Sequence, residues 1–190
     1  MEAVRQVYFP KRDAWRDWLE KNHLSEKKVA VIVYKKHTGK PSLNQKELME
    51  EAICFGWIDT TIKKLDHEKY LRYFVRRSNK GKWSKNTLGY ARDLIKKGKM
   101  SSEGIKRYKE GLKRRPHDEG IPKNPRVPQY LREEIEKDMG AKENFMKIAP
   151  SYKRMLLRWL LRAKLQETKE RRMKIIIQSL KNKEKLFPAA

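Results

Sequence analysis

The chain has 190 residues, 38% of them apolar, and its apolar runs fall short of the roughly 20 residues that span a membrane. Its first residues contain no apolar segment of signal-peptide length, so we expect a cytoplasmic protein. The single cysteine, Cys54, excludes an intramolecular disulfide.

The positive charge of the chain is concentrated in two segments. There are 48 Lys and Arg against 24 Asp and Glu, a net charge of +24. Residues 76–115 contain 15 basic and 3 acidic residues, and residues 151–185 contain 12 basic and 3 acidic residues. Such segments attract polyanions, so nucleic acid and anionic membrane surfaces are the expected partners. A well-solvated, Lys-rich surface is the alternative interpretation of the same composition.

The N-terminal part begins with alternating helix and strand patterns. Residues 11–23 carry aromatic and aliphatic side chains at helical spacing, which predicts an amphipathic helix. The β-branched run 29–34 predicts a buried strand. Asn44 and Glu47 then have the spacing of a capping box, so a helix is expected to begin there and to end near Gly56.

Two further strands, 57–65 and 70–77, are close enough in sequence to form an antiparallel hairpin. Alternation in the second strand places Leu71, Tyr73 and Val75 on one face and Tyr70, Arg72, Phe74 and Arg76 on the other. We expect Arg76 to lie on the outward face. These elements predict an α+β fold, with a small antiparallel sheet and packed helices in the N-terminal part and an all-helical C-terminal part.

The remaining sequence is predicted to be helical apart from one linker. Ser84 is a predicted N-cap, and a further helix ends near residue 112. Proline and glycine are frequent in residues 114–127, which predicts a linker between an α+β domain, 1–113, and a helical domain, 128–190.

Four short motifs resemble one protein family. Residues 52–59, A-I-C-F-G-W-I-D, resemble its A-L-x-F-G-W-I-D motif, and residues 76–86 are similar to its R…W-S-x-x-N segment. Residues 98–104 match its G-x-M…G, and residues 149–172 resemble its P-S…W-I…A-K…E-T-R-x-R signature. Taken together, over about Tyr8 to Leu180, the motifs resemble the YdeI/OmpD-associated, or bacteriocin-protection, family.

This resemblance implies a role in bacterial resistance to bacteriocins and cationic antimicrobial peptides, or in outer-membrane porin regulation, and it implies no reaction. Together with the charge, it predicts a non-enzymatic, polyanion-binding resistance protein.

The first candidate anion site surrounds Trp83. Trp83 lies in a basic loop directly before a predicted helix N-terminus, whose free N–H groups suit a phosphate or carboxylate. The site is predicted to consist of Arg76, Lys82, Ser84 and Asn86. In the alternative interpretation, Trp83 packs at the edge of the core and Ser84 is only a cap.

The second candidate anion site is a stripe of arginines in the predicted helix that begins at residue 150. Arg154, Arg158 and Arg162 are spaced i, i+4, i+8, so they share one face, and Arg171 extends the charge into the next helix. Such a stripe binds phosphates in some proteins and is a solvated face in others.

A different class of function would place a small-ligand or enzyme pocket near Cys54, Trp57, Asp59 and Trp83. In the alternative interpretation these residues have only structural roles. Cys54 is then a small buried side chain, and Asp59 caps a turn or pairs with a nearby arginine. The histidines lack metal-ligand spacing and the glycine motifs of nucleotide sites are missing, so no metal or cofactor is expected. A third hypothesis is a partner-binding module that uses the C-terminal helices.

Overall fold

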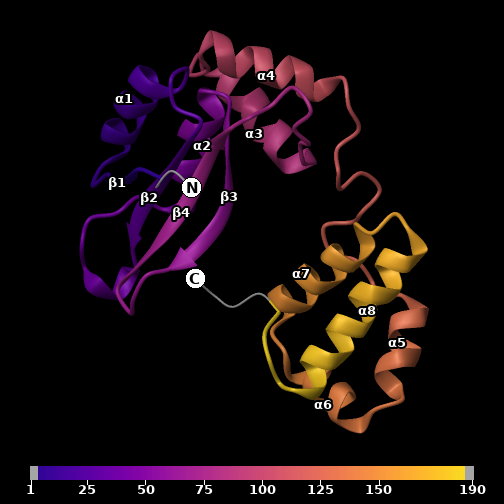
Figure 1. Cartoon of the computed structure of the whole chain (residues 1–190). Helices are drawn as coiled ribbons and strands as arrows, with labels where there is room; N and C mark the ends of the chain where they lie inside the picture. The colour runs from indigo at the N-terminus through magenta and orange to yellow at the C-terminus, as the bar shows by residue number, and fades with distance from the viewer. Residues whose placement is uncertain (1–3, 187–190) are drawn as a thin grey trace. The chain divides into compact units, whose positions relative to one another are not determined.

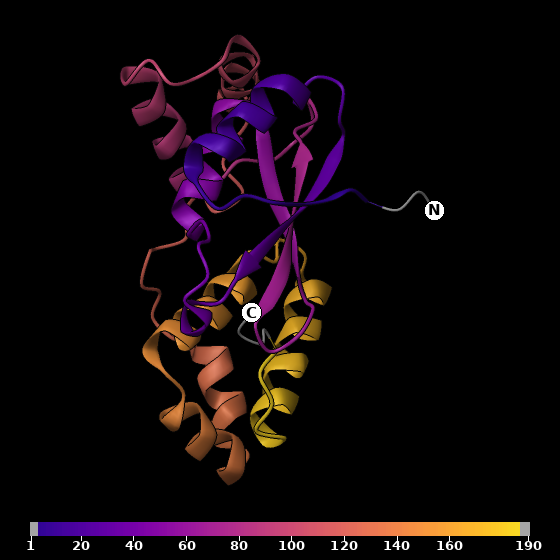
Figure 2. The ribbon, with the colours of Figure 1, turned by 90° about the vertical axis from the view of Figure 1, so that its left-hand side faces the viewer.

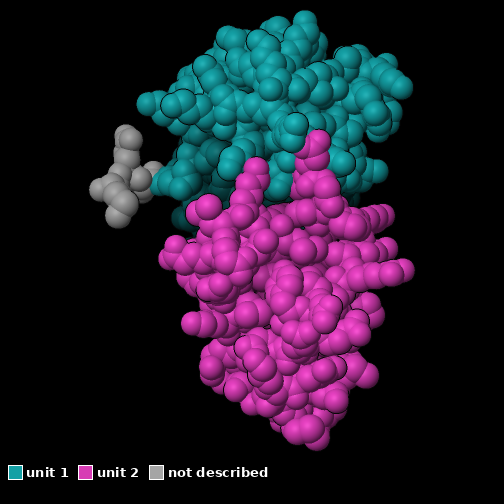
Figure 3. Space-filling view, turned by 90° about the vertical axis from the view of Figure 1, so that its right-hand side faces the viewer, with its two compact units in different colours: residues 1–117, 190 teal, residues 118–189 magenta. Residues whose placement is uncertain are grey.

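The structure is a computed structural model that describes residues 4–186. The chain divides into two compact units, one ending at His117 and the other beginning at Asp118 (Figure 3). This division falls inside the predicted linker 114–127. The predicted domains, 1–113 and 128–190, stay a prediction, and their outermost residues, 1–3 and 187–190, lie outside the described residues.

The N-terminal unit contains a four-stranded sheet with the order β1-β2-β4-β3 (Figure 1). Its strands are β1 (Gln6–Tyr8), β2 (Lys28–Tyr34), β3 (Trp57–Lys64) and β4 (Lys69–Arg76). The predicted hairpin pairs β3 with β4, and β2 also pairs antiparallel with β4. The predicted α+β class is confirmed. The sheet is mixed because β1, too short to show an alternating pattern, adds in parallel to β2.

The helices of this unit are α1 (Arg12–Asn22), α2 (Gln45–Cys54), α3 (Lys85–Lys96) and α4 (Ser102–Leu112), with a short 3₁₀ turn, η1 (Lys36–Thr38). Three of them begin at side-chain caps. Asn44 and Glu47 form the predicted capping box of α2, and Ser84 accepts from the backbone N–H of Thr87 at the start of α3. Ser101 caps α4 in the same way. Each cap satisfies a helix N–H group that would otherwise lack a partner.

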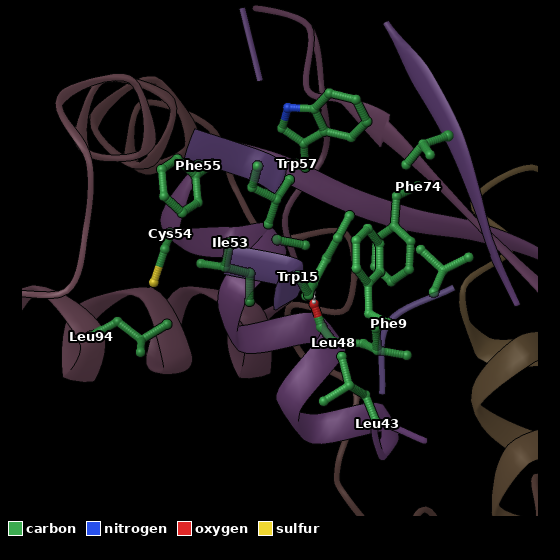
Figure 4. Packing of buried hydrophobic residues seen from close by; sticks show 14 of the residues in the cluster. Phe9, Trp15, Leu43, Leu48, Ile53, Cys54, Phe55, Trp57, Phe74 and Leu94 are labelled. Carbon is green, nitrogen blue, oxygen red and sulfur yellow. Dashed lines mark hydrogen bonds between the residues drawn. The ribbon is translucent and has the colours of Figure 1, made fainter. Parts of the chain in front are cut away.

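Helices α1 and α2 pack against one face of the sheet (Figure 2), and aromatic side chains fill the space between them. Trp15 is fully buried, and its ring centroid lies 5.3 Å from that of Phe74 on β4 (Figure 4). The face of β4 that carries Phe74 and Arg76 is therefore the inward face, which corrects the expectation that Arg76 points outward. The alternation was ambiguous because Leu71, on the opposite face, is also buried.

A buried carboxylate joins α1 to α2. Glu51 is 2% exposed and accepts from Arg12 Nε at 2.6 Å and from Arg16 Nη1 at 2.7 Å. Arg12 also donates to Glu50, at 2.9 Å. A buried carboxylate is tolerated only when it is paired in this way, so the two arginines fix the packing of the two helices.

Helix α4 approaches the end of α2 closely at Gly104. A Cβ atom at this position would lie 2.1 Å from the carbonyl oxygen of Cys54, so no larger residue fits without a backbone shift. The hydroxyl of Ser101 and its backbone N–H both donate to the same carbonyl, at 2.8 and 2.9 Å. These bonds fix the start of α4 on the end of α2.

The C-terminal unit is a bundle of four helices: α5 (Gln129–Glu136), α6 (Met139–Lys147), α7 (Pro150–Leu161) and α8 (Gln166–Lys181). They enclose a second core, whose fully buried members include Leu131, Leu156, Leu160 and Ile176. No helix among residues 4–186 combines the length and the apolar character that crossing a membrane requires.

Replacing Glu51 with glutamine is expected to lower the free energy of unfolding by roughly 2–4 kcal/mol, because both arginines keep their charge and lose the buried carboxylate between them, which Glu50 replaces only for Arg12. Urea denaturation followed by tryptophan fluorescence measures this change. Glu20→Gln, at an exposed position of α1, is the control and is expected to change the value by less than about 0.5 kcal/mol. Equal effects of the two substitutions would contradict the structural role of Glu51.

Candidate functional site

One face of α7 carries three arginines around a hollow of about 390 Å³. Pro150 occupies the first turn of the helix, and Leu156, Leu157 and Leu160 bury the opposite face in the core. The residues that line the hollow are Ser151, Arg154, Met155, Arg158, Trp159 and Arg162. The predicted stripe of Arg154, Arg158 and Arg162 is therefore brought together at one site. That it binds an anion stays a prediction.

Two of these arginines are held by the segment that precedes α5. Arg158 Nη2 donates to Asp118 at 3.0 Å, and its Nη1 donates to the carbonyl oxygen of Pro122 at 2.6 Å. Arg154 Nη1 donates to the side chain of Asn124 at 3.2 Å. Asp118 is only 5% exposed, and a buried carboxylate requires a cation. Arg158 therefore stabilises the C-terminal unit and also lines the hollow.

Arg162 differs from its two neighbours in the stripe. Within residues 4–186, its guanidinium forms no hydrogen bond or ion pair. Burial, and secondly the charges of Arg158 and Arg172, lower the pKa of Arg162, while Asp118 opposes the shift. A cation next to two other cations is stabilised by an anion, so Arg162 is the strongest candidate for contact with a ligand.

Arg172, and not the predicted Arg171, extends the charge from α8 to this helix. The guanidinium of Arg172 lies 4.8 Å from the centroid of the Trp159 ring and donates to the Trp159 carbonyl oxygen. Arg171 is exposed and does not line the hollow. The sequence could have indicated Arg172 in place of Arg171. Arg172 lies four residues before the buried Ile176, so the two residues share one face of α8.

The structure does not gather the first predicted anion site in the way expected. Arg76 donates to the carbonyl oxygen of Leu24, and the hydroxyl of Ser84 is engaged as the cap of α3. Lys82 and Asn86 are exposed. Because Arg76 belongs to the inward face of β4, it is directed to the end of α1 and away from this loop.

Trp83 is a packed side chain, in agreement with the structural alternative for this residue. It is 4% exposed, and a Cβ atom on Gly111 would lie 2.5 Å from its ring, so α4 needs glycine there. The guanidinium of Arg77 lies 3.7 Å from the ring centroid. The backbone N–H of His117 donates to the Trp83 carbonyl at 3.0 Å.

The small-ligand alternative receives little support from its four residues. Cys54 and Trp57 are fully buried, and with Trp83 they belong to the hydrophobic core (Figure 4). Asp59 accepts from Arg72 Nη1 at 2.7 Å, which is the arginine pairing that the sequence offered as an alternative. The part of the chain that the structure describes contains no cluster of three or more metal-ligating side chains.

The comparisons with known families divide the chain in the same region as the fold does. Residues 7–107, just over half of the chain, match a family model described as a domain of unknown function, DUF8412. Residues 124–183 match the model described as bacteriocin-protection, YdeI or OmpD-associated. No curated protein matches the chain, and no solved structure matches it either.

Cys54 provides a test of the packed interpretation of its surroundings. Burial, reinforced by the charge of Glu51, raises the pKa of the thiol to about 11. Alkylation by iodoacetamide at pH 8 is therefore expected to be very slow in the native protein and fast in urea, because only the thiolate reacts. Mass spectrometry follows the labelling over time. Rapid labelling of the native protein would instead indicate an open pocket at Cys54.

Proposed function

We propose that this chain, which belongs to the DUF8412 family through residues 7–107 and matches the bacteriocin-protection, YdeI or OmpD-associated model over residues 124–183, is a non-enzymatic polyanion-binding protein of bacteriocin resistance. The observation that carries the proposal is the arginine-lined hollow on α7. The proposal includes a cytoplasmic location, where nucleic acid and the inner membrane surface are the available polyanions.

The spacing of the three arginines suits a ligand with repeated charges. Residues four apart on a helix are separated by about 6 Å along its axis. Arg154, Arg158 and Arg162 therefore present positive groups at regular intervals along one line. A polymer with regularly spaced phosphates, or a layer of phospholipid headgroups, matches such a line better than a single small anion does.

The charge of the C-terminal unit is distributed unevenly, which favours the same face. Residues 128–150, which include α5 and α6, contain 4 basic and 5 acidic residues, whereas residues 151–185 contain 12 basic and 3 acidic residues. The excess positive charge of the bundle thus belongs to α7, α8 and the turn between them. A uniform compositional bias would have made all four helices basic.

Charge also constrains how such a protein would protect against bacteriocins. A chain with a net charge of +24 repels cationic peptides, so direct capture of such a peptide is electrostatically disfavoured. A positively charged protein can instead bind the polyanion to which the peptide would bind. We therefore propose that the protein occupies the target of the peptide and does not bind the peptide itself.

Replacing Arg162 with glutamine is expected to weaken binding to a labelled single-stranded or duplex oligonucleotide, or to phosphatidylglycerol vesicles, roughly fivefold at low salt, at about 1 kcal/mol for each basic contact. For nucleic acid, the slope of log K against log salt should decrease by about 0.7–0.9, since one phosphate contact is lost. Fluorescence anisotropy and vesicle co-sedimentation at two salt concentrations measure these effects.

The control for this experiment is Arg171→Gln, which removes the same charge from an exposed position of the same unit outside the hollow. It is expected to change affinity by less than about twofold, since only the long-range attraction is reduced. Arg158 is avoided because its loss would remove its ion pair with the buried Asp118 and so affect the stability of the unit. Equal effects of the two variants, or no binding to either polyanion at low salt, would contradict the proposal.

A further inference from the structure

Arg77, the residue after β4, is a buried cation that forms no ion pair with a carboxylate among residues 4–186. It is 5% exposed, its guanidinium lies against the Trp83 ring, and its Nη1 donates to the Lys82 carbonyl oxygen at 3.3 Å. Its Nε is buried and has no hydrogen-bond partner among residues 4–186. Burial lowers the pKa of Arg77 to about 10, and the charge of Asp59 only partly opposes this shift.

The carboxylate whose charge acts on Arg77 is already paired with another arginine. Asp59 pairs with Arg72, which is itself 4% exposed. This carboxylate is paired with Arg72, so it compensates the positive charge of Arg77 only in part. Proteins rarely bury a charged side chain without a partner, because the loss of hydration costs several kcal/mol for each ion.

The surroundings of Arg77 have the chemistry of an oxyanion site. The chain continues from Arg77 into a loop, residues 78–84, in which Gly81 N–H donates to Ser78 O at 3.0 Å and forms a tight turn. Asn79 accepts from Arg107 Nη1, which ties the loop to α4. Lys82 is exposed, and Ser84 is the N-cap of the twelve-residue helix α3, so the guanidinium contacts the two residues that precede this N-cap, Lys82 and Trp83. Helix N-termini and basic loops favour negative charge.

We propose that the 78–84 loop binds a phosphate-type oxyanion, with Arg77 as its buried cation and with Lys82 and the start of α3 as its outer contacts. A guanidinium offers two parallel N–H donors, which match two oxygens of such a group. The ligand is either free phosphate or the phosphoryl end of a larger molecule. This site is on the N-terminal unit and does not depend on the function of α7.

Thermal unfolding in phosphate and in chloride at equal ionic strength tests the inference. In the wild-type chain, phosphate is expected to raise the midpoint by about 5 °C near saturation, because a ligand that binds only the folded state stabilises it. Arg77→Met keeps much of the side-chain volume, removes the charge and should clearly reduce this rise. Arg92→Met, an exposed α3 arginine with a 65% exposed side chain, removes the same charge and should retain the rise.

A phosphate effect that is as large in Arg77→Met as in the wild-type chain, or that is missing from the wild-type chain, would overturn the inference and would leave Arg77 as a packing partner of Trp83. If Arg77→Met does not fold, hydrogen exchange on the wild-type chain decides the question. Phosphate should then slow exchange selectively in residues 78–87, and unchanged or uniformly slowed exchange would overturn the site.

A parallel titration with glycerol phosphate distinguishes the two sources of the ligand. Stabilisation by inorganic phosphate alone assigns the site to the free ion. Stabilisation by the monoester as well assigns it to a phosphoryl end. No stabilisation by either compound would overturn the inference.

Discussion

The pairing of arginine with a limited number of carboxylates is the constraint on which this structure depends. With 48 basic residues and 24 acidic residues, the chain does not contain a carboxylate for every cation. Three buried or half-buried carboxylates are engaged at joints between elements: α1 with α2, β3 with β4, and α7 with the segment before α5. These joints consist of Arg12 and Arg16 with Glu51, Arg72 with Asp59, and Arg158 with Asp118.

This division gives the arginines two kinds of role. Those that face a carboxylate hold helices or strands together, so replacing them would lower the free energy of unfolding. Arg77 and Arg162 have no such partner within the described part of the chain. Arg77 is enclosed between a ring and a loop, whereas Arg162 lies at the end of a hollow beside two other arginines. An anion would compensate either one, and the two proposals of binding rest on this shared physical reason.

Much of the fold was predictable because local signals decide helix starts. Asn44, Ser84 and Ser101 begin helices because their side chains accept from backbone N–H groups, an interaction that requires only a few neighbouring residues. The short strand β1 was not predicted, since three residues carry no readable period and β1 depends on pairing with β2. The inward face of β4 was misassigned because a buried residue, Leu71, lies on its other side.

The candidate site was only partly predictable for a similar reason. Helical spacing alone brings Arg154, Arg158 and Arg162 together, and the structure has them on one face. Which arginines are paired depends on residues 40 positions away in sequence, as with Arg158 and Asp118. The same holds for Arg77, whose burial depends on Trp83 and, through that ring, on the glycine at position 111. Spacing predicts a shared face, whereas only tertiary packing decides whether a charge is compensated.

The most direct test is to locate anions on the folded protein. Crystals of the full chain would be soaked in tungstate, a heavy oxyanion whose position is visible by anomalous scattering. The account predicts peaks beside Arg162 and beside Arg77, and none beside the Glu51-paired guanidinium groups of Arg12 and Arg16. Peaks at the carboxylate-paired arginines, with none at Arg77 and Arg162, would contradict the claim that the unpaired arginines are the anion-binding residues.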